Sequence, residues 1–245
     1  MSVPNIIGFA VLFVLQAVTT FIFLKVEIPK PSKKSLAMKM TCSTIFILNA
    51  LLAMLTAGNF SNYTFFILIG LAFSWVGDFL LHYKVTENWF IAGVMTFMCG
   101  HIFYIAAFLK VQRTYFPDAP FLDFTEALLM IVGICFSQFR LYTHKAEYGK
   151  AFLPCTVYMN VIMIMLVKAL WLSIRFIMNG TVENALATGI ILAFGAGLFT
   201  LSDFTLALLR FTHRYSQSYA IRKVNIWTYF YAQMLLGLTI LNIAV

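Results

Sequence analysis

Two aspartates stand out because each lies within a long apolar run. Asp78 falls in the run 62–81, and Asp203 falls in the run 185–209. An Asp inside a bilayer costs about 2.5 to 3.5 kcal/mol on insertion scales, so such residues usually serve a function. Two neighbouring carboxyl groups in a low dielectric have pKa values that are pushed apart. One group then stays protonated and can act as a general acid, while the other is ionised and can act as a base. We predict a catalytic pair, and a structural hydrogen bond or ion pair between helices is the alternative.

Further polar residues accompany this pair. Counted from the nearest basic flank at about 1.5 Å per residue, both aspartates lie roughly 6 to 10 Å inside the membrane boundary. By the same measure His101 lies roughly 10 Å deeper, where it is either a buried structural histidine or a proton shuttle at the floor of a pocket. The residues assigned to substrate binding are His82, His101, Tyr104, Tyr158, Asn160, Ser202, Tyr231 and Gln233.

Two other kinds of chemistry stay open at this point. Asp78, His82, His101 and Asp203 could bind Zn²⁺ for metal-assisted hydrolysis, but the greater depth of His101 argues against a shared coordination sphere. We therefore predict no metal and no other cofactor. The acid pair could also couple protons in a small transporter, although a transporter needs access from both faces. No P-loop, GxSxG, HExxH or paired CxxC motif is present, which argues against a nucleotidase, a serine lipase or a zincin.

The elements that must hold these residues are transmembrane helices. Hydrophobic residues make up 62% of the 245-residue chain and charged residues 11%, and a spanning helix takes about 20 apolar residues. We predict an all-α, polytopic membrane bundle of eight helices, with residues 1–245 as a single transmembrane domain. The fifth run contains Asp123, Glu126 and Arg140, so seven spans are the alternative. The runs are roughly 5–24, 40–57, 62–81, 89–109, 121–139, 151–173, 185–209 and 225–244.

The basic residues predict the orientation. In the eight-span arrangement most Lys and Arg residues fall on one side, which the positive-inside rule makes cytosolic. The aspartates then lie near the cytosolic face and both termini are non-cytosolic. The same bias explains the net charge of +8 without a nucleic-acid partner. Lys168, inside the sixth run, either snorkels or pairs with Glu126. The basic residues of the predicted cytosolic side are Lys25, Lys30, Lys33, Lys34, Lys39, Lys84, Arg140, Lys145, Lys150, Arg210, Arg214, Arg222 and Lys223.

Several segments resemble the lysoplasmalogenase-like family of membrane proteins, also called the YhhN family. They follow one another from the third predicted helix to the eighth, and the runs around Ser202-Asp203 and Tyr231-Ala232-Gln233 are the most specific. The first two helices match in hydrophobicity alone. The matching segments are Gly77-Asp78-Phe79-Leu80-Leu81, Gly100-His101-Ile102-Phe103-Tyr104, Val157-Tyr158-Met159-Asn160, residues 195–208 and Tyr229-Phe230-Tyr231-Ala232-Gln233.

The resemblance implies a hydrolase of the endoplasmic reticulum or another cell membrane that cleaves the vinyl ether bond of lysoplasmalogens. The products would be a fatty aldehyde and glycerophosphoethanolamine or glycerophosphocholine. One aspartate would protonate the vinyl ether and the other would stabilise the cation and activate water, but the sequence does not say which. The expected partners are a lysophospholipid substrate and membrane lipids, and a homo-oligomer stays open. The basic residues expected to attract the phosphate are Lys150, Arg214, Arg222 and Lys223.

Overall fold

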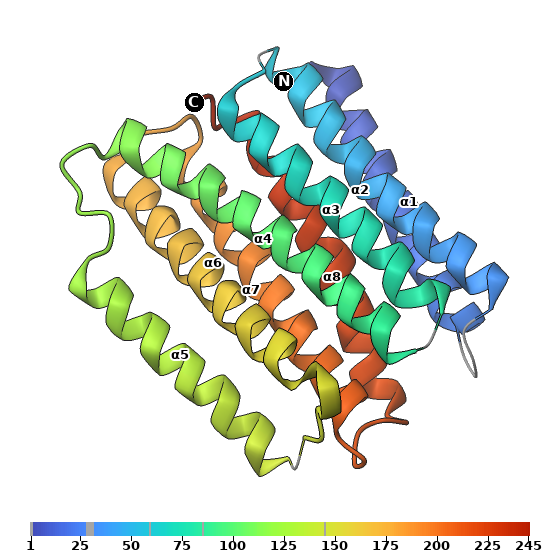
Figure 1. Cartoon of the computed structure of the whole chain (residues 1–245). Coiled ribbons are helices and arrows are strands. Elements are labelled where there is room, and N and C mark those ends of the chain that lie inside the picture. Colours follow the sequence, from blue (N-terminus) through green and yellow to red (C-terminus); the bar gives the residue numbers. More distant parts are fainter. Residues whose placement is uncertain (1, 28–31, 59, 85, 145) are drawn as a thin grey trace.

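In the computed structural model, the chain folds into a bundle of long helices (Figure 1). The structure describes residues 2–27, 32–58, 60–84, 86–144 and 146–245, and these contain no strand. The all-α prediction is therefore confirmed for the described residues. Their eight α-helices are α1 (Val3–Glu27), α2 (Lys33–Ala57), α3 (Asn62–Tyr83), α4 (Glu87–Tyr115), α5 (Phe124–Thr143), α6 (Phe152–Asn179), α7 (Ala185–Phe211) and α8 (Tyr219–Leu238).

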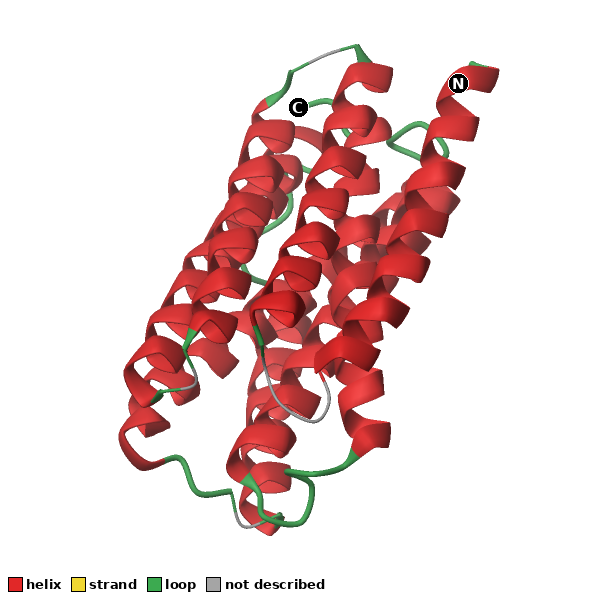
Figure 2. Ribbon diagram, turned by 90° about the vertical axis from the view of Figure 1, so that its right-hand side faces the viewer, coloured by secondary structure: helices red, strands yellow, loops and turns green. Residues whose placement is uncertain are grey.

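Both termini lie at the same end of the bundle (Figures 1 and 2). The opposite end contains the connections that follow Glu27, Tyr83, Thr143 and Phe211, and we call it the basic end because the lysines and arginines predicted to be cytosolic gather there. Of that set, Lys30 and Lys145 lie outside the described residues. The assignment of the basic end to the cytosol stays a prediction.

Seven of the helices in the described part of the chain are long and apolar enough to cross a membrane, which indicates an integral membrane protein. The exception is α5, the helix whose span was least secure in the sequence. It has 20 residues, about 30 Å of helix, and the chain enters it from the end of α4 and leaves it towards the start of α6. Figure 1 shows α5 at the edge of the bundle, on the outer side of α6.

A buried polar cluster fastens the start of α5 to its neighbours. The ammonium of Lys168 lies 2.8 Å from Oε1 of Glu126, and it also donates to Oε1 of Gln112 on α4 at 3.1 Å. Lys168 is only 2% exposed, so it does not snorkel to the surface, and the predicted pairing with Glu126 is confirmed. A charge pair this deeply buried survives only because each partner compensates the other.

Close packing brings α3 and α4 together on the side of the bundle where the aspartates lie. A Cβ on Gly70 would lie 2.2 Å from Cε1 of Tyr104, and one on Gly77 would lie 2.6 Å from Cε2 of Phe97. The two glycines therefore accept aromatic rings from α4 where larger residues would clash. Gly77 precedes Asp78, so this contact fixes the helix that carries the first aspartate.

The second helix begins earlier than the apolar run predicts. Ser32 caps α2 with a reciprocal pair of hydrogen bonds to Ser35, so the helix starts at Lys33 rather than near residue 40. Such a capping box supplies partners for backbone groups at the helix start, and it does not depend on hydrophobicity. The extension makes Lys39 a helical residue of α2, and it contacts Asp78, as does Ser43 farther along the same helix.

Candidate active site

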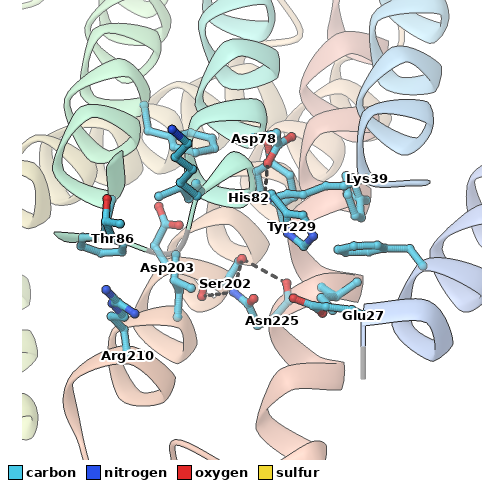
Figure 3. Close-up of a pocket in the computed structure, with 18 residues that line it drawn as sticks. Glu27, Lys39, Asp78, His82, Thr86, Ser202, Asp203, Arg210, Asn225 and Tyr229 are labelled. Atoms are coloured by element: carbon cyan, nitrogen blue, oxygen red, sulfur yellow. Dashed lines mark hydrogen bonds and ion pairs between the residues drawn. The ribbon is translucent and has the colours of Figure 1, made fainter. Parts of the chain in front are cut away.

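Both aspartates line one cavity of about 170 Å³ at the basic end. Side chains from α1, α2, α3, α4, α7 and α8 surround it, and Figure 3 shows Asp78 with Lys39 on one side and Asp203 with Arg210 on the other. Sequence-distant acids thus share one small enclosure. The lining residues are Phe23, Glu27, Lys39, Asp78, Leu81, His82, Lys84, Thr86, Phe90, Phe97, Ser202, Asp203, Leu206, Arg210, Asn225, Ile226, Tyr229 and Phe230.

Asp78 has a partner on each carboxylate oxygen. Its Oδ1 lies 3.2 Å from the ammonium of Lys39, and its Oδ2 accepts hydrogen bonds from Ser43 at 2.5 Å and from the hydroxyl of Tyr229 at 2.7 Å. The residue is 1% exposed. A buried carboxylate with a cation and two donors is stabilised in its charged form by all three groups.

Asp203 has a different environment. Its Oδ2 accepts a hydrogen bond from Tyr158 at 2.6 Å, and Nε2 of His101 lies 3.7 Å from the same oxygen. Within the described part of the chain no Lys or Arg lies within ion-pair distance of Asp203, and no hydrogen bond reaches its Oδ1. Because Asp203 also lines the cavity, this second oxygen is the one available to a ligand.

Aromatic side chains connect the two acids. The centroid of the Phe199 ring lies 4.4 Å from that of His101 and 5.6 Å from that of Tyr229. Phe199 therefore packs between a neighbour of Asp203 and a hydrogen-bond partner of Asp78. Behind Tyr229, Gln233 donates to the Tyr229 hydroxyl at 3.4 Å and accepts from Tyr104 at 2.8 Å. This chain of hydroxyl and amide groups fixes the orientation of the phenol that holds Asp78.

Several of the predicted substrate-binding residues lie in or next to the cavity. His82 lines it, with Nε2 2.7 Å from the hydroxyl of Ser35, and Ser202 lines it while bonded to Asn225 of α8. Four more of the eight predicted residues do not line the cavity but belong to the hydrogen-bond networks that support the aspartates. These four are His101, Tyr104, Tyr158 and Gln233.

Two predicted substrate-binding residues are placed elsewhere. Tyr231 stacks on Trp227 with ring centroids 5.7 Å apart and faces Phe13 of α1. Asn160 has a buried Oδ1 that has no partner among the described residues. Neither residue lines the cavity. Each follows a network tyrosine by two positions, Tyr229 and Tyr158, and residues two apart on a helix point to different sides.

The depth predicted for His101 was wrong. The sequence estimate put it roughly 10 Å deeper than the aspartates, whereas its Nε2 lies 3.3 Å from the Tyr158 hydroxyl and 3.7 Å from Oδ2 of Asp203. The estimate assumed that all helices stand upright with their ends at one level. The contact shows that separate counts along α4 and α7 did not place these two side chains relative to each other.

Reasoning from sequence missed several lining residues. Lys39, Lys84 and Arg210 look like the basic flanks that any positive-inside topology requires, so nothing distinguished them as site residues. None of the basic residues proposed to attract a phosphate, which were Lys150, Arg214, Arg222 and Lys223, lines the cavity. Phe97 and Asn225 carried no signal beyond their helical position.

The four candidate zinc ligands do not gather into one site. His82 bonds to Ser35 and His101 lies beside Asp203, while Asp78 is engaged by Lys39. Among the described residues no group of three or more His, Cys, Asp or Glu side chains is arranged to hold a metal ion.

Comparison with known proteins identifies the family. A family model described as the YhhN family matches residues 35–240. The chain belongs to the YhhN family. All the lining residues of the cavity except Phe23 and Glu27 fall within the matched part of this YhhN protein. The resemblance of the helix-three to helix-eight segments is thereby confirmed, and the match also covers α2, which contributes Lys39 and Ser43. Neither the search of curated proteins nor the search of solved structures found a match.

Proposed function

We propose that this YhhN protein is a membrane-embedded hydrolase that cleaves the vinyl ether bond of lysoplasmalogens. The observation that carries the proposal is the unequal engagement of the two acids in one cavity. Asp78 has partners on both oxygens, including the cation of Lys39, while Oδ1 of Asp203 is available to a ligand. Paired carboxyl groups in unlike environments are the arrangement that acid–base chemistry requires.

In the proposed reaction, Asp203 is the general acid. Its carboxyl proton is transferred to the β-carbon of the vinyl ether, the C=C π bond supplies the electron pair for the new C–H bond, and an oxocarbenium ion forms. Asp203, now a carboxylate, takes a proton from the attacking water, whose oxygen bonds to the cationic carbon. The resulting hemiacetal collapses to the aldehyde and the free glycerol hydroxyl. Glycosidases use carboxyl pairs with oxocarbenium-like states in the same way.

Asp78 stabilises the charge that develops. Its carboxyl group is held in place by Lys39, Ser43 and Tyr229, so it needs no rearrangement when the oxocarbenium ion forms. Fixed charges of this kind in a site that excludes water usually contribute most to catalysis. Tyr158 and His101 position Asp203 from the other side.

The size of the cavity restricts where the lipid lies. About 170 Å³ is smaller than the roughly 300 Å³ or more of pockets that enclose a drug-sized ligand. The cavity therefore takes the vinyl ether and glycerol portion, and the aliphatic tail lies outside it. A small apolar recess lined by Val94, Met159 and Ala207 adjoins Asp203 and offers contact to the first carbons of the tail.

The test measures aldehyde release by purified protein from a lysoplasmalogen and from its saturated alkyl ether analogue. We expect turnover of the vinyl ether alone, and a loss of about 100-fold or more in kcat for Asp203→Asn and for Asp78→Asn. Asp118→Asn, at an exposed position in the connection after α4, is the control and should retain full activity. Normal turnover by Asp203→Asn would refute the acid assigned here.

The endoplasmic reticulum is the membrane in which we propose that the protein acts. Helices apolar enough to span a bilayer support a membrane location. Imaging of the tagged full chain against organelle markers tests the compartment, and accumulation in another membrane would contradict it.

A further inference from the structure

Two cations in the cavity wall have no acidic partner among the residues that the structure describes. Lys39 is paired with Asp78, and the lining carboxylate of Glu27 is paired with Arg222 at 3.5 Å. Lys84 and Arg210 also line the cavity, and no carboxylate in the described part of the chain lies within 4.0 Å of either. Lys84 and Arg210 are therefore positive charges of the cavity lining that no carboxylate of the described residues compensates by an ion pair.

Aromatic rings contact both cations. The guanidinium of Arg210 lies over the ring of Phe90 at 5.0 Å, and Phe90 itself lines the cavity. Lys84 lies 5.5 Å from the ring of Tyr83 and 5.9 Å from that of Trp89. Contacts of this type orient a cation without neutralising it, so both groups stay available to an anion.

A threonine that follows Lys84 by two positions also belongs to the lining. Thr86 lines the cavity, and its side chain makes no capping hydrogen bond to α4. Figure 3 draws Thr86 and Arg210 on the same side of the cavity, away from Lys39 and Asp78. Two cations and one free hydroxyl are the groups that proteins use to bind phosphate oxygens.

The spacing along α7 fits a substrate with an acid-labile bond at one end and a phosphate at the other. Asp203 and Arg210 are seven residues apart, so they share one helix face and are about 10 Å apart along the axis. A bound lysolipid that places its vinyl ether at Asp203 extends its glycerol towards the basic end. The side chain of Arg210 then reaches the phosphodiester.

We propose that Lys84 and Arg210, with Thr86, form a subsite for a phosphate group. This inference rests on the proposed function, because the phosphodiester head group of the one-chain lipid is the ligand that the position of Asp203 favours. The basic residues that line no cavity, such as Arg214 and Lys223, take no part in this subsite.

Equilibrium binding tests the subsite apart from catalysis. The probe is a saturated alkyl ether lysophosphoethanolamine, and the comparison is the neutral alkylglycerol with the same tail. We expect Arg210→Gln and Lys84→Gln each to weaken binding of the phospholipid about 10-fold, the size of one charge-assisted hydrogen bond, and to leave the alkylglycerol unaffected. Arg210→Lys should restore part of the affinity, which shows that a folded protein is being measured.

Matched control variants are available at the basic end of the bundle. Arg214 is exposed and lies over the ring of Tyr215 at 5.3 Å, so Arg214→Gln removes a similar stacked cation, and Lys223→Gln removes an exposed lysine. Both should bind the phospholipid like the wild type. An equal loss in these controls, or an equal loss of alkylglycerol binding in the subsite variants, would overturn the proposal, because it would show general surface charge or a folding defect.

Soluble anions distinguish the source of the phosphate. If inorganic phosphate or glycerophosphoethanolamine displaces the lysolipid from the wild type but not from Arg210→Gln, the subsite is supported. Displacement by inorganic phosphate also identifies free phosphate as an alternative occupant. Binding of the ether lysolipid through Lys84 and Arg210, without aldehyde release from the vinyl ether, would refute the proposed reaction and support the subsite. Normal vinyl ether turnover with an unaltered KM in Arg210→Gln and in Lys84→Gln would support the proposed reaction and refute the subsite.

Discussion

The ammonium of Lys39 lies 3.2 Å from Oδ1 of Asp78, and this contact joins α2 to α3 inside the wall of the cavity. The side chain of Asp78 is 2% exposed and that of Lys39 is 13% exposed. Because little water reaches either group, each depends on the other for compensation of its charge. The pair thus links the stability of the bundle to the electrostatics of the candidate site.

Removal of the lysine should destabilise the protein strongly. Lys39→Met leaves the Asp78 carboxylate buried without its cation, and we expect a loss of about 3 to 5 kcal/mol in the free energy of unfolding. The double variant Lys39→Met/Asp78→Asn should recover part of that loss, because no charge is then left unpaired. Thermal unfolding in detergent measures both, with Lys33→Met at an exposed position of the same helix as control. A double variant less stable than the single one would contradict the pairing.

Loss of the Tyr158 hydroxyl should affect the chemical step and leave substrate affinity intact. Tyr158 donates to Oδ2 of Asp203 at 2.6 Å without lining the main cavity. We expect Tyr158→Phe to lower kcat roughly 10-fold or more with little change in KM, and to displace the pH–rate profile. Tyr63→Phe removes a comparably buried hydroxyl, bonded to Thr239 at 2.7 Å near the other end, and its kcat and pH profile should match the wild type. A raised KM with normal kcat in Tyr158→Phe would contradict the positioning role.

Isotopic labels should follow the proposed order of bond formation. Protonation of the vinyl ether in D₂O places one solvent deuterium on the carbon next to the aldehyde, because Asp203 exchanges its proton with solvent before each turnover. In ¹⁸O-labelled water the glycerophosphoethanolamine should stay unlabelled, since water adds to the cationic carbon and the bond to the glycerol oxygen breaks last. Mass spectrometry of the borohydride-trapped alcohol and of the head group measures both. Label in the glycerol hydroxyl would rule out this path.

The buried pair at the other end should secure α5 without affecting catalysis. Glu126→Gln and Lys168→Met each leave one buried charge unpaired, so each should lower the thermal unfolding midpoint, and the double variant should lose less than the sum of the two. Aldehyde release at permissive temperature should remain normal, because the cavity lies at the basic end. Glu183→Gln, at an exposed position before α7, serves as control. Strict additivity of the two losses would show that the ion pair contributes no coupling.

The start of α5 should also respond to acid. A hydrogen bond from Thr125, followed by those from the Glu126 backbone and the Trp171 indole, lowers the pKa of Asp123 from 3.8 to about 2. A lowered pKa means that this contribution to stability is present above pH 3.8 and is lost as the pH falls towards 2. Because the indole of Trp171 donates to Asp123 at 2.8 Å, tryptophan fluorescence should show a transition near pH 2 that Asp123→Asn abolishes. A transition centred near pH 4 would contradict the lowered pKa.

Hydrophobic runs predicted most of the fold, because a helix in a bilayer must satisfy its own backbone and its length follows from the membrane. The runs were too short where polar residues extend a helix at one of its ends. For α2, Ser32 and Ser35 set the true start, and hydropathy carries no information about such caps. The residue lost by this error, Lys39, is one of the three partners of Asp78.

The two acids of the site and the partners of Asp203 could be predicted from the cost of burying polar groups, but the partners of Asp78 were not among the predicted site residues. Helical periodicity alone separates Tyr229, which faces Asp78, from Tyr231, which faces α1. Periodicity does not help with His101, because a count of residues along one helix does not reveal how that helix is placed along its neighbours. Its contact with Asp203 depends on the packing of α4 against α6 and α7, which is a property of the assembled bundle.

The small volume of the cavity has a kinetic consequence. If only the vinyl ether and glycerol portion enters about 170 Å³, the tail of each substrate molecule remains dissolved in the bilayer throughout turnover. The rate of the proposed reaction then follows the mole fraction of lysolipid in the membrane surface, and dilution with inert lipid slows that reaction at constant bulk concentration. The two products separate by solubility, because the aldehyde stays in the hydrocarbon phase while the head group enters water.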